Sequence, residues 1–130
     1  KVILLTQNAL FNMRCWVIFS GASELWYLKC LKPGFRHCFV MFNDGHKWMS
    51  IDPMAHKTEV ISHDLPATYN VIQWIETQNC LAVEVRIKPP PRRALPPMLF
   101  TCVEAVKRII GLHDFGIVTP WQLYKALIKP

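Results

Sequence analysis

The chain has few charged residues and no long uninterrupted apolar run. Asp, Glu, Lys and Arg make up only 18% of its 130 residues, whereas 52% are hydrophobic and 12% are aromatic. This composition excludes disorder over most of the length and is typical of a packed globular domain. The longest apolar stretches, such as residues 15–19, are too short to cross a bilayer, and no signal peptide with a clear cleavage site is present. We therefore expect a domain without a transmembrane segment.

The cysteines lack the number and spacing that disulfide frameworks and zinc sites need. There are five, at positions 15, 30, 38, 80 and 102, and no two form a CxxC pair. An odd number without such a pair argues against a disulfide scaffold and against a zinc ribbon. We expect a reducing compartment such as the cytoplasm, with a phage-associated location as the alternative.

Acidic residues are the minority among the charged ones. Fifteen Lys and Arg stand against nine Asp and Glu, which gives a net charge of +6 and a sequence pI of about 9.2. A basic surplus favours anionic surroundings such as nucleic acid, cell-wall polymers or membrane surfaces. Most of the basic residues are scattered, however, and no DNA- or RNA-binding signature accompanies them. We expect solvated basic side chains and no specific nucleic-acid partner.

The length is sufficient for one domain with its own core, and we expect a single domain over residues 1–130. The chain begins at Lys1 rather than at methionine, which leaves room for an upstream segment, and Met13 is a candidate internal start. We therefore predict no element for residues 1–12. Residues 88–97, KPPPRRALPP, contain five prolines and can extend neither a strand nor a helix. This segment is expected to be a stiff surface crossover.

Before the crossover, the pattern predicts mainly strands. The run at 16–20 is read as a strand, and 22–31 as a short helix that ends before Pro33-Gly34. Val, Ile, Trp and other strand-favouring residues recur in five later segments, namely 35–42, 47–52, 59–62, 71–76 and 81–87. We expect these segments to form an antiparallel sheet.

After the crossover, the pattern predicts two helices. Residues 101–110 carry apolar side chains at 103, 106, 109 and 110, the spacing of one buried helix face, and Gly111 stands where a C-terminal cap belongs. A last helix is predicted to follow Thr119, because Pro120 takes its first position and Gln122 its third.

A histidine and an aspartate occupy the two arms of the hairpin over residues 36–53. If Asp44-Gly45 is a two-residue turn, His37 lies directly across from Asp52. Opposed side chains share a face, with Cβ atoms about 4.5–5.5 Å apart, so the aspartate can accept the imidazole N–H. The alternative is an ordinary strand histidine together with a turn that opens at Asp52-Pro53.

Cys102 is the nucleophile candidate for this pair. Thr101-x-x-Glu104 has the form of a capping box, which makes Cys102 the first residue of the helix. The free N–H groups and the positive end of the helix dipole stabilise a thiolate there and can also hold an oxyanion. The alternative is a small buried residue at a helix end. Cys38 is predicted to point away from the face of His37, and we interpret it and the other three cysteines as core or incidental.

The order of these motifs resembles a known family. A histidine that opens one strand and an Asp-Pro that closes the next after a tryptophan, here His37, Trp48 and Asp52-Pro53, are similar to the transglutaminase-like and papain-like cysteine hydrolases. The cysteine helix follows the histidine strand here, as in the circularly permuted branch of NlpC-like amidases and peptidases and their lecithin:retinol acyltransferase-like relatives. The Thr-Pro-x-x-Leu element at 119–123 is also similar to that branch. The likeness spans residues 35–130.

The resemblance implies an α+β fold of permuted papain-like topology, with an antiparallel sheet packed against the nucleophile-bearing helix. It further implies a thiol hydrolase without metal or cofactor, in which Cys102 is the nucleophile, His37 the base and Asp52 the residue that orients the histidine. Peptide, peptidoglycan-type or isopeptide amides are the expected substrates. Acyl transfer by the same triad is one alternative.

Two alternatives belong to other classes of protein. One is a catalytically silent binding or structural module of a larger assembly, for example a phage particle. The other is a metal site built from histidines, although their spacings match no ligand pattern; these are His46, His56, His63 and His113.

Overall fold

The computed structural model describes residues 13–21, 33–54, 56–88 and 101–130. In these residues five strands form one antiparallel sheet in the order β4-β3-β2-β1-β5, and three helices pack against it. The strands are β1 (Arg14–Ser20), β2 (His37–Asn43), β3 (Lys47–Pro53), β4 (Thr58–Pro66) and β5 (Leu81–Val85); the helices are α2 (Val71–Thr77), α3 (Cys102–Ile110) and α4 (Pro120–Ile128). The expected α+β class is confirmed. The helix predicted over 22–31, residues 1–12 and all but the first residue of the 88–97 crossover lie outside the described residues.

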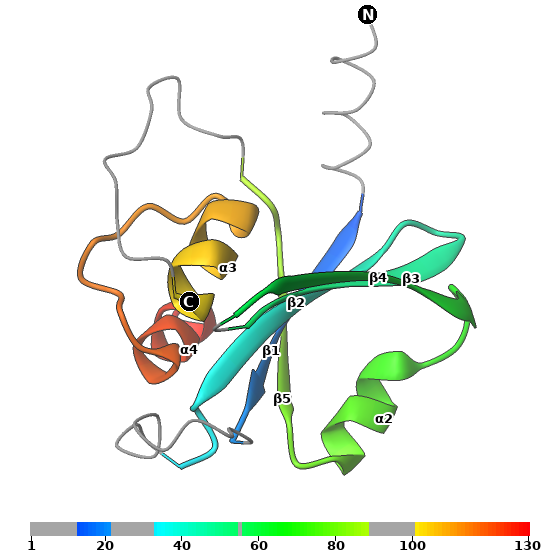
Figure 1. Ribbon diagram of the computed structural model, residues 1–130, viewed down its shortest axis with the longest axis horizontal. Coiled ribbons are helices and arrows are strands. Elements are labelled where there is room, and N and C mark those ends of the chain that lie inside the picture. The colour runs from blue at the N-terminus through cyan, green and yellow to red at the C-terminus, as the bar shows by residue number, and fades with distance from the viewer. Residues whose placement is uncertain (1–12, 22–32, 55, 89–100) are drawn as a thin grey trace, which may run out of the picture.

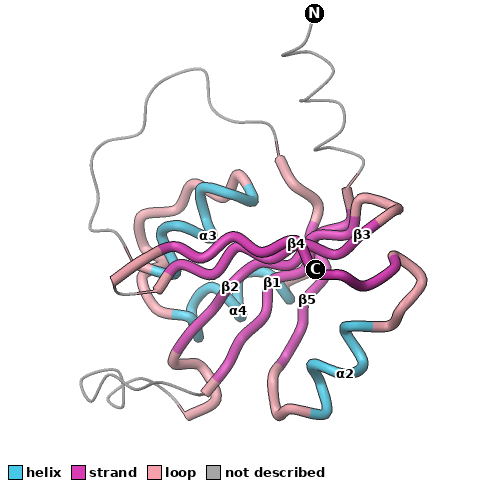
Figure 2. Tube along the Cα trace, turned by 45° about the vertical axis from the view of Figure 1, so that its right-hand side comes forward, coloured by secondary structure: helices cyan, strands magenta, loops and turns pink. Residues whose placement is uncertain are grey.

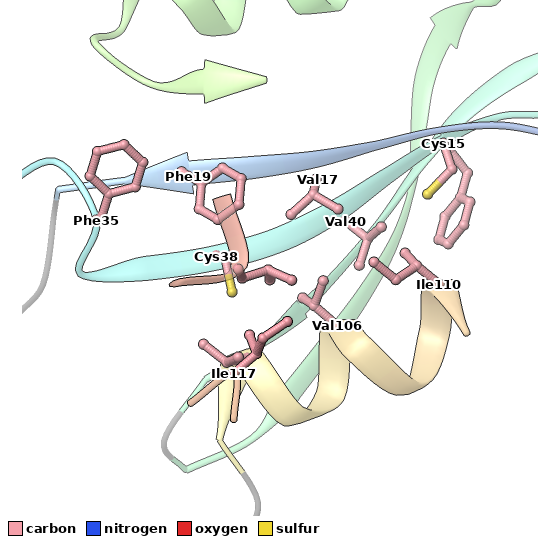
Figure 3. Packing of buried hydrophobic residues seen from close by; sticks show 12 residues of the cluster. Cys15, Val17, Phe19, Phe35, Cys38, Val40, Val106, Ile110 and Ile117 are labelled. Atoms are coloured by element: carbon pink, nitrogen blue, oxygen red, sulfur yellow. The ribbon is translucent and has the colours of Figure 1, made fainter. Parts of the chain in front are cut away.

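The helices cover both faces of the sheet. Helices α3 and α4 lie on one face, and α2 lies across the sheet from them in both views (Figures 1 and 2). Strand β1 is buried from Cys15 to Phe19 because its odd positions face α3 and α4 while Trp16 and Ile18 face α2. This double burial explains its continuous apolar sequence. Figure 3 shows the larger cluster, in which Cys38 and Val40 of β2 point toward α3.

The segment predicted as a strand over 71–76 is the helix α2, so that prediction is wrong. Val71 and Ile75 are 4% and 5% exposed, and their spacing of four residues puts them on one helix face. The Asn70 side chain accepts the Gln73 N–H at 3.1 Å and caps the first turn. High strand propensity at Val, Ile and Trp was therefore overridden by a cap and by burial of one face.

The two C-terminal helices begin where their capping residues predict. Thr119 caps α4 in a complete capping box with Gln122. Gly111 ends α3 in the left-handed conformation at φ 77°, and a Cβ there would lie 2.6 Å from the Lys88 carbonyl oxygen. The Lys88 N–H in turn donates to the Ile110 carbonyl at 3.0 Å, so the end of α3 is fixed to the segment that follows β5.

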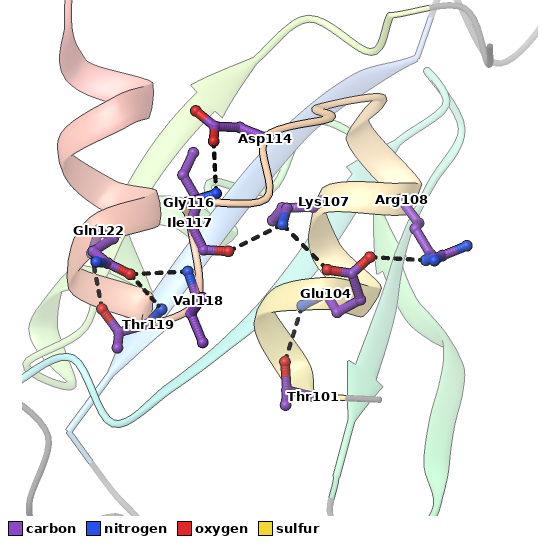
Figure 4. Close-up of polar contacts among 10 residues, drawn as sticks. All are labelled: Thr101, Glu104, Lys107, Arg108, Asp114, Gly116, Ile117, Val118, Thr119 and Gln122. Atoms are coloured by element: carbon purple, nitrogen blue, oxygen red, sulfur yellow. Dashed lines mark hydrogen bonds and ion pairs between the residues drawn. The ribbon is translucent and has the colours of Figure 1, made fainter. Parts of the chain in front are cut away.

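A buried lysine joins α3 to the loop before α4 (Figure 4). Lys107 is 3% exposed, and its ammonium donates to Glu104 at 3.1 Å and to the carbonyl oxygen of Ile117 at 3.0 Å. Arg108 donates to the other oxygen of Glu104 at 3.0 Å. Each buried polar group in this set therefore has a partner, and the Lys107–Ile117 bond fixes α3 to the loop before α4.

Candidate active site

The β2–β3 hairpin turns one residue later than predicted. The Asp44 N–H donates to the Lys47 carbonyl at 3.3 Å, so the turn is centred on Gly45 and His46 and not on Asp44 and Gly45. The Asp44 carboxylate accepts the backbone N–H groups of His46 and Lys47 at 2.7 and 2.8 Å, which stabilises this position, and Gly45 provides the positive φ of 91°. The predicted two-residue turn at Asp44-Gly45 is wrong.

The displaced turn still leaves His37 beside Asp52. When the centre of the turn shifts by one residue, the residue opposite any given position shifts by two along the partner strand. Side chains two residues apart in a strand point to the same face, so His37 and Asp52 still share a face of the sheet. The β2–β3 ladder pairs Val40 with Ile51, which places Asp52 diagonally from His37 and not directly opposite. The carboxylate Oδ1 lies 2.5 Å from His37 Nε2, and the two side chains are 22% and 24% exposed. Asp52 therefore occupies Nε2 and leaves Nδ1 for another partner.

Cys102 is the first residue of α3, as its sequence context predicted. Thr101 is the N-cap, and its hydroxyl oxygen accepts the Glu104 N–H at 3.1 Å. The Glu104 carboxylate, which a complete capping box would direct back to Thr101, instead accepts hydrogen bonds from Lys107 and Arg108. The predicted N-cap is thus confirmed. Glu104, however, bonds to two side chains of its own helix and does not complete a capping box. Cys102 is half-buried and belongs to the first turn of α3, whose N–H groups lack partners within the helix.

The Cys102 sulfur is hydrogen-bonded to the His37 ring, and their surroundings shift the pKa values of the two groups in opposite directions. A hydrogen bond from the Cys38 thiol, opposed by burial and assisted by hydrogen bonds from His37 and the Cys38 backbone, lowers the pKa of Cys102 from 9.0 to about 5. Burial alone would lower the pKa of His37, but hydrogen bonds to Asp52 and Cys102 and their negative charges raise it from 6.5 to about 9. Between these values the pair is a thiolate and an imidazolium.

Cys38 is the residue of this site that sequence reasoning missed. Alternation along β2 places it on the face opposite His37, as predicted, and this face is the one that α3 covers. Cys102 belongs to α3, and the Cys38 thiol hydrogen-bonds to it. His37 and Cys38 can both reach one sulfur because they are the first two residues of β2, and the β2–β3 ladder begins only at Val40. No local pattern in the sequence signals this contact.

The histidines considered as metal ligands do not lie together in the structure. His46, His56 and His113 are exposed, and the ring of His63 is hydrogen-bonded to the Ser50 hydroxyl at 2.9 Å. Among the described residues, no group of three or more His, Cys, Asp and Glu side chains is arranged to hold a metal ion. Of the remaining cysteines, Cys15 is fully buried and Cys80 is half-buried, while the fifth lies outside the described residues.

Comparison of the chain with models of protein families, with curated proteins and with solved structures found no match. Over the described part of the chain, no helix combines the length and the apolar character that a membrane span requires. The contacts among Cys102, His37 and Asp52 are the structural features that bear on function.

Proposed function

We propose that the chain is a cysteine hydrolase of permuted papain-like topology that acts on amides or esters through Cys102, His37 and Asp52. The observation that supports it most is the convergence of three side chains from β2, β3 and the first turn of α3 in the order carboxylate, imidazole, thiol. A thiolate at a helix N-terminus beside an imidazolium is the activated state of a cysteine nucleophile.

The topology is consistent with the permuted order. The histidine strand comes first, the aspartate strand second and the cysteine helix last. Helix α3 packs on the sheet face that contains Cys38 and Val40, next to the strand that starts with His37. This arrangement supports the permuted papain-like topology that the motif order implies.

In the proposed reaction, the Cys102 thiolate attacks the carbonyl carbon and the backbone N–H groups at the start of α3 stabilise the oxyanion. The His37 imidazolium then gives its proton to the leaving amine or alcohol as the carbon–heteroatom bond breaks, which leaves a thioester on Cys102. Neutral His37 next takes a proton from water, and the resulting hydroxide attacks the thioester. Collapse of the second tetrahedral intermediate releases the acid and restores the thiolate and the imidazolium. Asp52 keeps Nε2 occupied, so that Nδ1 carries the proton being moved.

We expect the substrates to be peptide, peptidoglycan-type or isopeptide amides, and transfer to an amine or alcohol in place of water would make the same site an acyltransferase. The preference for amides follows from the family resemblance, with support from the net charge of +6.

An activated ester tests the proposal directly. The protein should acquire one acyl group from p-nitrophenyl acetate with a burst of nitrophenol, and mass spectrometry of the intact and digested chain should locate the group on Cys102. Cys102→Ala should abolish both signals, whereas Cys80→Ala removes another half-buried thiol and should change neither. An unchanged adduct in Cys102→Ala, or no adduct in the unaltered protein, would overturn the proposal. A peptidoglycan fragment and a branched isopeptide, offered separately, would then distinguish the substrate classes.

A further inference from the structure

Cys38 is the second residue of β2 and is fully buried against α3. It belongs to the apolar cluster that Cys102 packs against, and Figure 3 shows its side chain directed to the α3 side of the sheet. Both its thiol and its backbone N–H are hydrogen-bonded to the Cys102 sulfur. Two donors of one residue thus converge on the sulfur, in addition to the His37 ring.

Because Cys38 and Cys102 are hydrogen-bonded, a negative charge on one disfavours ionisation of the other, and their surroundings decide which one carries the charge. The hydrogen bond to Cys102, burial, and the negative charges of Cys102 and Asp52 raise the pKa of Cys38 well above its ordinary value, so its thiol stays neutral and donates. A partly buried anion is costly unless donors surround it. The Cys38 thiol and backbone N–H supply two such donors from strand β2, and the His37 ring supplies a third.

We propose that Cys38 is a positioning residue, whose thiol and backbone N–H hold the Cys102 sulfur in front of the His37 ring. Its importance for turnover rests on the proposed function, but its hold on the sulfur can be measured without any substrate. Serine can replace the donor with a hydroxyl, whereas alanine removes it. Each variant changes only the side-chain contribution, because the backbone N–H remains.

The experiment measures how fast iodoacetamide alkylates Cys102 from pH 4 to pH 10, read by mass spectrometry of the peptide that contains it. In the unaltered protein the rate should rise with a midpoint near pH 5. Cys38→Ala should move the midpoint upward by about one pH unit or more, which lowers the thiolate fraction on the acid limb by about tenfold or more. Cys38→Ser should restore part of the change.

Cys15→Ala is the matched control, since Cys15 is another fully buried thiol of the same cluster and its pKa is raised by burial alone. This variant should leave the midpoint unchanged. Should Cys38→Ala fail to fold by circular dichroism, Cys38→Val, which fills the site and suits a strand, takes its place with the same expectation. An unshifted midpoint in a folded Cys38 variant, or an equal shift in Cys15→Ala, would overturn the inference.

The two proposals fail separately in these measurements. If no ester or amide is turned over but the Cys38 variants shift the midpoint, the inference stands and the hydrolase proposal falls. If the unaltered protein is an active hydrolase and Cys38→Ala keeps both its midpoint and its kcat/KM, the inference falls and the hydrolase proposal stands.

Discussion

Replacement of His37 by glutamine should raise the pKa of Cys102 and thereby expose how strongly the two groups are coupled. The ring is hydrogen-bonded to the sulfur, and between the two pKa values of about 5 and about 9 it carries a positive charge beside the thiolate. Glutamine keeps a polar side chain of similar reach but cannot be protonated. The hydrogen bonds from the Cys38 thiol and backbone N–H remain in the variant, so the pKa of Cys102 should rise only part of the way toward 9.0.

The magnitude follows from the loss of one opposite charge in contact with the thiolate. Such a charge commonly displaces a pKa by about 1 to 3, so the midpoint of Cys102 should move from about 5 to between about 6 and about 8. At pH 6 the thiolate fraction would then fall from about nine-tenths to between about one-half and about one-hundredth. The plateau rate above pH 9 should increase by about threefold for each unit of pKa, because a more basic thiolate is a better nucleophile.

The assay is the pH dependence of iodoacetamide alkylation of Cys102, with the thiolate absorbance as a second readout after subtraction of a Cys102→Ser variant. His63→Gln is the control, since His63 is another half-buried histidine of the sheet but its ring is bonded to Ser50. The control should keep a midpoint near pH 5. A His37→Gln midpoint equal to that of the unaltered protein, or an unaltered protein that titrates near 9, would refute the reasoning about the ion pair.

Three further predictions concern Asp52, the C-terminal cap of α3 and the buried lysine of α3. Asp52→Asn removes a negative charge from the ring, so the pKa of His37, followed by NMR, should fall from about 9 toward 6.5, and no fall would contradict the contact. Gly111→Ala should lower the free energy of unfolding, measured in urea, by more than the roughly 1–2 kcal/mol that a left-handed alanine costs, because its Cβ would also lie 2.6 Å from a backbone oxygen. Gly45→Ala is the control: its φ is also positive, at 91°, but a Cβ there meets no atom, so it should cost only the roughly 1–2 kcal/mol of the backbone conformation. Lys107→Met leaves a buried carbonyl oxygen and one carboxylate oxygen unpaired and should cost about 1–3 kcal/mol in the same assay, so an equally stable variant would show that these bonds contribute little.

Features that depend on neighbours within a few residues could be predicted from the sequence. Helix α3 begins after Thr101 and ends at Gly111 because a hydroxyl cap and a residue free to adopt positive φ are local requirements. The common face of His37 and Asp52 was predictable for a similar reason: strand alternation has a period of two, so it survived an error in the position of the turn. Cys102 was found as the nucleophile candidate because a helix N-terminus changes the chemistry of whatever residue occupies it.

Where local signals competed, or where the deciding contact joins distant segments, only the tertiary structure could decide. Propensity favoured a strand over residues 71–76, and burial of one face made it the helix α2. The neutral donor at Cys38 and the charged acceptor at Cys102 come from β2 and α3, and their contact exists only after the helix has packed on the sheet. The sequence by itself determined that Cys102 begins a helix and that His37 and Asp52 share a face of the sheet, because those properties are set within one turn or one strand repeat. The folded chain decided the charge that each of them carries, because a pKa depends on burial and on partners that the backbone brings from far away.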